Sequence, residues 1–227
     1  MPNQKRLSKE ELTQDEFTAS VFKFIGYAEQ NYPKLIAGAG AVVVLVLIGV
    51  FIADSANKKA QAGIDAIGDV QVSLMQGNTS SAITKAQAIA RDYSGEEIAG
   101  RAVITLANIY YDQGRFDEAT AQYRKFLSDV SDESGPQGYG ANAGIAASME
   151  AQGNTAGAAQ QHETYANSYG NTPYAPLALL EAGRCYISAG NLAQAKVVFE
   201  RIRKDYASST QARVAQTELE ILGEVIN

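Results

Sequence analysis

The sequence VITLANIYYDQGRFDEA, residues 103–119, repeats the pattern of LLEAGRCYISAGNLAQA, residues 179–195. In both stretches a small residue is followed three residues later by a tyrosine, and the closing alanine lies five residues after a glycine. The aligned pairs are Gly114 with Gly190, Tyr110 with Tyr186, Ala119 with Ala195 and, just beyond, Tyr123 with Phe199. Two matching copies indicate an internally repeated architecture.

Two weaker copies of the pattern centre on Gly153 and Gly77. The copy at Gly153 includes Ile145, Ala146, Met149, Ala158 and Tyr165, and the copy at Gly77 includes Val70, Ala82, Ala86 and Ile89. The four glycines are spaced 37, 39 and 37 residues apart. Such regular spacing predicts one structural unit per repeat, stacked on its neighbours into a solenoid.

Each repeat is predicted to be a helical hairpin that turns at its glycine, because glycine adopts the left-handed conformation that ends many helices at little cost. Small residues would let the two helices touch: Ala107, Ala146 and Gly183 on the first helices, and Ala119, Ala158 and Ala195 on the second. Larger residues are expected to pack onto neighbouring hairpins: Tyr123, Phe126, Phe199 and Ile202. A last helix, residues 211–225, would cap the stack with Ala212, Ala215, Leu219 and Leu222 on its inner side.

These repeats resemble the tetratricopeptide repeat (TPR), which has small residues at its eighth and twentieth positions and an aromatic residue at its eleventh. The period is about 37 rather than 34 residues, which lengthens the loops between repeats. Val103, Asn142 and Leu179 stand where the family has tryptophan, and the proline that ends a repeat is absent. The resemblance implies an all-α fold, a TPR-like α-solenoid of hairpins with a C-terminal capping helix.

Residues 35–53, LIAGAGAVVVLVLIGVFIA, contain no charged side chain. As a helix this run would be about 28 Å long, close to the roughly 30 Å hydrocarbon core of a bilayer. It predicts a single transmembrane helix. A cleaved signal peptide is the alternative, since Ala53, Asp54 and Ser55 loosely resemble a cleavage site, but the run is too long and too far along the chain. We therefore expect the chain to stay anchored.

Small residues share one face of this run: Ala37, Ala41, Gly49 and Ala53, interrupted by Leu45. A stripe of small residues lets another membrane helix approach closely. Ordinary glycine and alanine content in a membrane helix explains the stripe equally well, so both interpretations stay open.

An amphipathic helix is predicted between Thr13 and the membrane run. Apolar residues recur there at helical spacing: Phe17, Val21, Phe24, Ile25, Ala28 and Tyr32. Pro33 is expected to break or kink the chain before the span. The polar face is not rich in lysine, so docking on a partner protein and lying in the lipid headgroup region are both retained.

The predicted layout has a cytoplasmic segment with the amphipathic helix (1–33), a transmembrane helix (34–53), a linking helix (54–76) and a TPR-like repeat domain (77–227). This layout resembles membrane-anchored, periplasmic TPR-like proteins, including the ancillary subunit of the bacterial Sec translocon. The resemblance implies a bacterial inner-membrane protein with a cytoplasmic N-terminus, a periplasmic repeat domain, and translocon components or periplasmic chaperones as partners. Lysines near the span are tied, two on each side, so charge bias alone does not set the orientation.

The composition argues against several functional classes. The 227 residues carry a net charge of −6 and include one cysteine and one histidine. An acidic chain lacks the basic surface of a nucleic-acid binder, and so few cysteines and histidines remove most metal and catalytic-triad chemistry. Cys185 and His162 are therefore predicted to be packing residues. We expect no enzyme activity, cofactor, metal or small-molecule substrate.

The inner face of the first helices is the predicted partner-binding surface. By repeat position it includes Arg101, Asn108, Tyr111, Asp112, Glu150, Arg184 and Ile187. The face lacks the Lys/Asn pattern with which some TPR domains clamp a C-terminal carboxylate, so a mixed apolar and polar protein interface is preferred over that mode. A solvated face without a ligand is the alternative.

Two functions follow from these features. The first is a non-enzymatic, single-pass membrane adaptor whose repeats bind proteins at the Sec translocon or in envelope protein assembly. The second is a structural or accessory subunit of another large inner-membrane complex, docked through its transmembrane and N-terminal helices.

Overall fold

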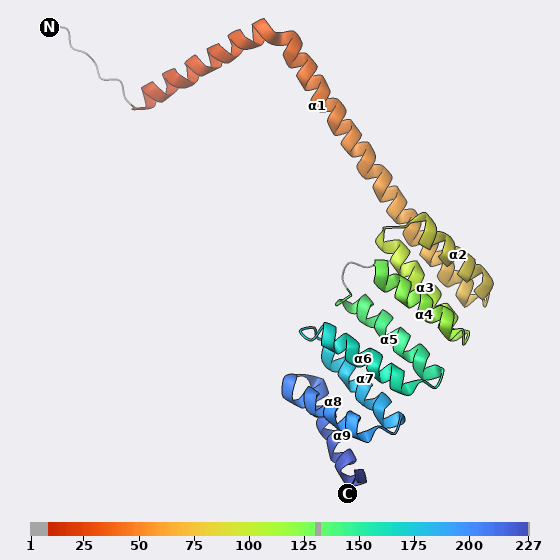
Figure 1. Ribbon diagram of the computed structural model, residues 1–227. Coiled ribbons are helices and arrows are strands. Elements are labelled where there is room, and N and C mark those ends of the chain that lie inside the picture. Colours follow the sequence, from red (N-terminus) through yellow and green to blue (C-terminus); the bar gives the residue numbers. More distant parts are fainter. Residues whose placement is uncertain (1–8, 130–132, 227) are drawn as a thin grey trace, which may run out of the picture. The chain divides into compact units, whose positions relative to one another are not determined.

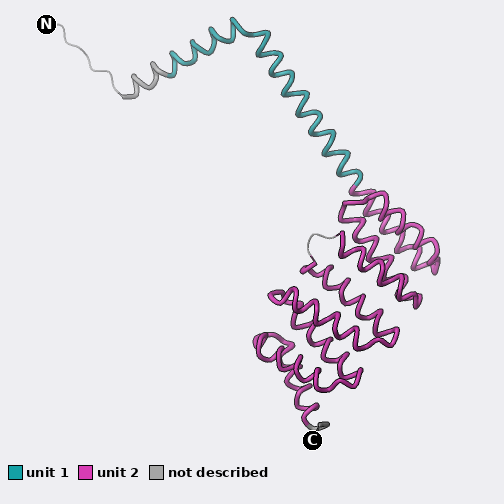
Figure 2. The backbone as a smooth tube through the Cα atoms, viewed as in Figure 1, with its two compact units in different colours: residues 1–59 teal, residues 60–227 magenta. Residues whose placement is uncertain are grey.

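The computed structural model describes the backbone of residues 9–129 and 133–226 and the side chains of residues 17–129 and 133–223. These residues form nine α-helices and no strand. The helices are α1 (Lys9–Met75), α2 (Thr79–Asp92), α3 (Glu97–Asp112), α4 (Phe116–Asp129), α5 (Pro136–Ala151), α6 (Thr155–Ser168), α7 (Ala175–Ser188), α8 (Leu192–Asp205) and α9 (Thr210–Ile226), shown in Figure 1. The chain divides into two compact units, residues 1–59 and 60–227 (Figure 2).

From α2 to α8, each helix packs against the next one in the chain. Each successive hairpin turns at one glycine: Gly77, Gly114, Gly153 and Gly190 in chain order. Figure 1 shows the hairpins stacked in the same order. This arrangement confirms the predicted all-α solenoid of TPR-like hairpins.

The hairpin turns share one backbone design. Their glycines have φ angles of 73° at Gly77, 73° at Gly114, 82° at Gly153 and 74° at Gly190. The Gly153 N–H donates to the Glu150 carbonyl, 2.9 Å away. The next N–H, that of Asn154, donates to the Met149 carbonyl at 2.9 Å. This pair of bonds is the Schellman cap, which satisfies the last carbonyls of a helix, and it recurs at the other three turns.

An asparagine follows three of the four turn glycines and begins the second helix. The Asn154 side chain accepts a hydrogen bond from the Gly157 N–H at 3.0 Å. Asn78 and Asn191 cap α2 and α8 in the same way. An asparagine cap stabilises a helix by about 1 kcal/mol because it satisfies an N–H that otherwise has no partner. A Gly-Asn pair therefore ends one helix and begins the next.

The small residues predicted at the helix contacts are buried, and those on the second helices have no exposed surface: Ala119, Ala158 and Ala195. The larger residues divide into two kinds. Tyr123 reaches the next hairpin, since a Cβ added at Gly144 would lie 2.4 Å from its ring. The Phe199 ring lies against Gly183 of its own hairpin, and the Phe126 ring lies close to Gly100 of its own first helix, so these two rings also fill the space between the paired helices.

The loops between hairpins are joined by tyrosine hydroxyls. The Tyr169 hydroxyl donates to Glu133 Oε2 at 2.8 Å, and the Tyr206 hydroxyl donates to the Gly170 carbonyl at 3.0 Å. Each bond links residues 36 positions apart, which is one repeat. Consecutive loops are therefore tied to each other along one edge of the array.

Helix α9 packs on α8 and α7, as expected of a final helix. Ala212, Ala215 and Leu222 are buried, and Leu219 is partly buried. The predicted inner side of this helix is confirmed for these four residues.

The repeat unit starts earlier than the sequence analysis placed it. The C-terminal part of α1, from Ala60, belongs to the same compact unit as α2 to α9. Ile67 and Val70 lie in its core, and Gly63 lies close to Tyr93 and Ile98. Residues 60–75, assigned from the sequence to a linking helix (54–76), therefore form the first helix of the first hairpin.

Within residues 9–59, α1 is helical throughout and includes Pro33. The chain stays helical past Pro33, so the predicted break is not seen, while Figure 1 shows α1 sharply bent in its N-terminal part, as the predicted kink requires. Among the described helices, one, Phe17–Met75, is long and apolar enough to cross a membrane; its most apolar window has a mean hydropathy of 2.9 and no buried residue.

Candidate protein-interaction surface

The first helices of the four hairpins expose the same repeat positions. These positions lie thirteen, nine, six and two residues before each turn glycine. They are Ile64, Gly68, Gln71 and Met75 on α1; Arg101, Thr105, Asn108 and Asp112 on α3; Gly140, Gly144, Ala147 and Ala151 on α5; and Leu177, Glu181, Arg184 and Ser188 on α7. All sixteen are exposed or partly exposed, and we call this set the first-helix face.

Contacts between α3, α5 and α7 join their parts of the face. The Tyr123 hydroxyl donates to Asn108 Oδ1 on α3 at 2.6 Å, and its ring covers Gly144 on α5. Between α5 and α7, burial, followed by the charges of Glu150 and Glu181, raises the pKa of the Cys185 thiol to about 11. At the start of α7, the Tyr174 ring stacks on the Tyr139 ring of α5 with ring centroids 5.2 Å apart.

Five of the seven residues predicted to bind a partner are exposed: Arg101, Asn108, Asp112, Glu150 and Arg184. Tyr111 and Ile187 are partly buried, and the Tyr111 ring meets the Phe116 ring edge-on at 5.4 Å. Arg184 pairs with Glu181 at 2.8 Å, an exposed contact that contributes at most about 1 kcal/mol. The seven residues lie on or beside the first-helix face, and their binding role stays a prediction.

The face changes in character along the array. On the first hairpin it is apolar, with Ile64 51% and Met75 80% exposed. Helix α3 adds Arg101 and Asp112, whereas α5 contributes only glycine and alanine at the four positions. Charge returns on α7 with the Arg184–Glu181 pair. The face is thus mainly apolar on the first hairpin, charged on α3 and α7, and made of small residues on α5. A protein partner with both apolar and polar groups would complement such a surface.

Sequence reasoning missed the first-hairpin part of the face and the small residues of α5. The first part escapes prediction because the sequence pattern starts the repeats at Gly77 and leaves Ile64 and Met75 in a linking helix. The signal was present: both residues stand at the same distances from Gly77 as Arg101 and Asp112 do from Gly114.

The two residues with reactive side chains are buried in the repeat core. His162 is 8% exposed, and burial lowers its pKa to about 4. Cys185 is 4% exposed, and its raised pKa keeps the thiol protonated. Within the described part of the chain, no group of three or more His, Cys, Asp or Glu side chains is arranged to hold a metal ion.

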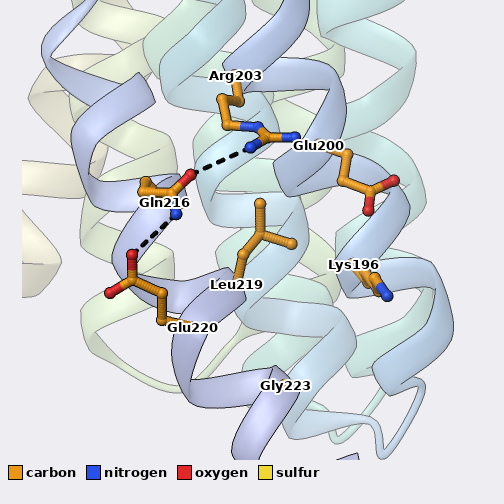
Figure 3. Close-up of a pocket in the computed structure, with 7 residues that line it drawn as sticks. All are labelled: Lys196, Glu200, Arg203, Gln216, Leu219, Glu220 and Gly223. Atoms are coloured by element: carbon orange, nitrogen blue, oxygen red, sulfur yellow. Dashed lines mark hydrogen bonds between the residues drawn. The ribbon is translucent and has the colours of Figure 1, made fainter.

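A shallow cavity of about 250 Å³ lies between α8 and α9 (Figure 3). Its charged walls include Lys196 and Glu200, while Gln216 accepts from Arg203 at 3.4 Å and donates to Glu220 at 2.8 Å. Gln216 thus links Arg203 to Glu220, and the lining residues include no nucleophile beside a base, so the cavity lacks the arrangement of a catalytic site.

The membrane-spanning candidate has no packing partner within the described chain. Every side chain of residues 35–53 is exposed, including the stripe Ala37, Ala41, Gly49 and Ala53. A Cβ added at Gly49 would meet nothing within 4 Å. The role of the stripe in helix packing therefore stays a prediction.

Comparison with known proteins supports the repeat architecture. Residues 29–137 match the model of a tetratricopeptide repeat-like domain, and residues 177–209 match a tetratricopeptide repeat. No curated protein gives a significant match. The chain is similar in structure to a tetratricopeptide repeat protein from Parabacteroides merdae ATCC 43184, with a TM-score of 0.54 and 22% identity over 72% of this chain, and it spans 61% of that protein.

A second similar structure is a putative kinesin light chain from Podosopora anserina that has nearly identical TPR-like repeats. The TM-score is 0.52 and the identity 14%, and the match covers 70% of this chain and 84% of that chain. Identities this low support the fold alone. TPR-like repeats generally mediate protein–protein interactions and are typically found in non-enzymatic scaffolds. The two matches support a tetratricopeptide repeat family, and the observed hairpins give residues 60–226 a TPR-like solenoid arrangement.

Proposed function

We propose that the protein is a non-enzymatic, membrane-anchored adaptor whose TPR-like array binds other proteins. One observation carries the proposal: a charge-free helical run, residues 35–53, with every side chain exposed, occurs in the same chain as the repeat array. An apolar helix of this length is stable in a bilayer and costly in water, because its 16 apolar side chains would otherwise be hydrated.

The first-helix face supports the adaptor role. In solenoid proteins, equivalent positions of successive repeats form extended binding surfaces. Here the equivalent positions combine exposed apolar side chains such as Met75 with exposed charges such as Asp112, as expected for a protein interface. The partner is therefore a protein with apolar and polar groups, not a small molecule.

We further propose a bacterial inner-membrane location, with the N-terminus in the cytoplasm and the repeats in the periplasm. The support is the resemblance of the layout to the ancillary subunit of the Sec translocon. Translocon components, periplasmic chaperones or envelope-assembly proteins are the partners this resemblance implies.

Purification of the tagged full-length protein from its own membranes, followed by quantitative mass spectrometry, tests this function. Asp112→Lys and Arg184→Glu reverse charges on the first-helix face, and Arg124→Glu reverses an exposed charge on α4 as the matched control. The adaptor role predicts that the two face variants lose partners that Arg124→Glu retains. Equal recovery in all variants, together with loss of partners only on deletion of residues 1–53, would instead indicate a subunit docked through its N-terminal helices.

A further inference from the structure

The helical segment before the membrane run, residues 17–32, exposes an unusual number of aromatic side chains. The exposed aromatic residues are Phe17 (70%), Phe22 (68%), Phe24 (67%), Tyr27 (57%) and Tyr32 (62%). Val21 and Ile25 add aliphatic surface to the same helix. No contact among residues 17–129 and 133–223 covers these side chains, and an exposed apolar surface of this kind marks an interaction site.

Length excludes burial of the whole apolar region in the hydrocarbon core. Residues 17–53 would extend about 55 Å as a helix, whereas the core is about 30 Å thick. The charge-free run 35–53 alone accounts for that thickness. Lys23, Glu29 and Lys34 carry charges in the preceding segment, and each such charge costs about 3 kcal/mol at the bilayer centre.

The arrangement of side chains on the segment is that of a helix lying along an interface. At 100° per residue, Phe17, Val21, Phe24 and Tyr32 fall within one apolar face, and Gln30 falls opposite them. Tyr27 and Phe22 lie on the two flanks of this face, where an interfacial helix meets the headgroups. Phenylalanine and tyrosine at the edge of a membrane span favour the headgroup region, where a ring is buried beside polar groups.

We infer that residues 17–32 lie in the lipid headgroup region next to the transmembrane helix, with the Phe17–Phe24–Tyr32 side facing the hydrocarbon. The inference rests on the proposed membrane anchor. Lipid is preferred to a partner protein because the aromatic surface is continuous in sequence with the span. Pro33 is the point between them where the helix can bend, since proline removes one backbone hydrogen bond and its ring crowds the preceding turn.

The absence of tryptophan from the chain allows a direct test. Three single variants each place one fluorophore in the full-length protein: Phe24→Trp on the apolar side, Gln30→Trp on the opposite side and Val46→Trp in the span. Each variant is reconstituted into nanodiscs of phosphatidylethanolamine and phosphatidylglycerol, without any other protein. Emission and quenching are then recorded with lipids brominated either near the glycerol region or near the bilayer centre.

The inference predicts that Phe24→Trp emits at shorter wavelength than Gln30→Trp and is quenched more strongly by shallow bromines than by deep ones. Val46→Trp should be quenched most strongly by deep bromines. Water-like emission from both Phe24→Trp and Gln30→Trp, with Val46→Trp still quenched, would overturn the inference and indicate docking on a partner protein while leaving the anchor intact. Absence of quenching at Val46→Trp would overturn the anchor itself.

Discussion

Residues 17–53 and the repeat array use similar apolar side chains in opposite ways. Phe199, whose ring lies against Gly183 of α7, has no exposed surface, whereas Phe24 is 67% exposed. Val198 is 1% exposed and Val46 is 58% exposed. An apolar composition shows which segments must be shielded from water. The chain buries these side chains itself only in the array, where small residues and tight turns bring a second helix alongside.

The largest effect should come from truncating matched phenylalanines in the two regions. Phe199→Ala removes a fully buried ring and should lower the free energy of unfolding of the array by about 3–5 kcal/mol. Phe24→Ala should leave that value unchanged. Urea denaturation of both variants, followed by far-UV circular dichroism in the same detergent, measures the contrast. A comparable loss in Phe24→Ala would mean that residues 17–32 are covered by the array.

A charge placed on matched valines should have the next largest effect, of a different kind. Val46→Lys puts an ammonium in the charge-free run and should raise the cost of membrane insertion by about 2.5–3.5 kcal/mol. Val197→Lys, at a site of almost equal exposure on α8 (56%), should not. Carbonate extraction of membranes should release more of the first variant than of the second. Equal retention of the two would argue against residues 35–53 as the span.

The single histidine gives the stability of the array a pH dependence. Burial lowers the pKa of His162 in the folded state to about 4, below its ordinary 6.5, so the unfolded chain binds more protons between these values. The array should therefore lose stability as pH falls from 6.5 toward 4, by up to about 1.4 kcal/mol per pH unit. Denaturation at pH 7 and pH 5 should show a smaller difference in His162→Gln. An unchanged difference would mean that other groups titrate instead.

The smallest effect concerns the helix caps. Asn191 caps α8 by accepting the Gln194 N–H, so Asn191→Ala should cost about 1 kcal/mol. Asn31 provides the control, because its side chain only donates to the Tyr27 carbonyl within a continuous helix. Thermal unfolding should separate the two variants by a few degrees. Identical midpoints would show that the backbone bonds at Gly190 suffice to form the turn.

The repeat architecture could be predicted because its determinants are local. Turn glycines at regular spacing, small residues seven before and five after them, and aromatic residues between are all visible in the sequence. The first hairpin is harder to recognise because its first helix, which carries Ile67 and Val70, is the continuation of the helix that contains the membrane run. No turn or cap separates the two parts. Whether a ring such as Phe199 packs within or between hairpins depends on helix geometry, which the pattern does not encode.

The binding surface could be predicted only in outline. Repeat position identifies exposed residues such as Arg101 and Asp112, because helical geometry fixes which side of the first helix faces away from its partner. It does not reveal that the Asn108 amide is engaged by Tyr123 or that Arg184 is paired with Glu181. Those contacts come from other elements and depend on side-chain conformation.

The tyrosine bonds between loops bear on how the array bends. At the loop edge, Tyr169 and Tyr206 form partly buried bonds from one repeat to the next. At the turn edge, Gln152 and Asp117 form an exposed bond of the same kind, which water competes with more readily. We therefore expect the array to be stiff along its loops and compliant along its turns, so that its curvature adjusts to the width of whatever protein occupies the first-helix face.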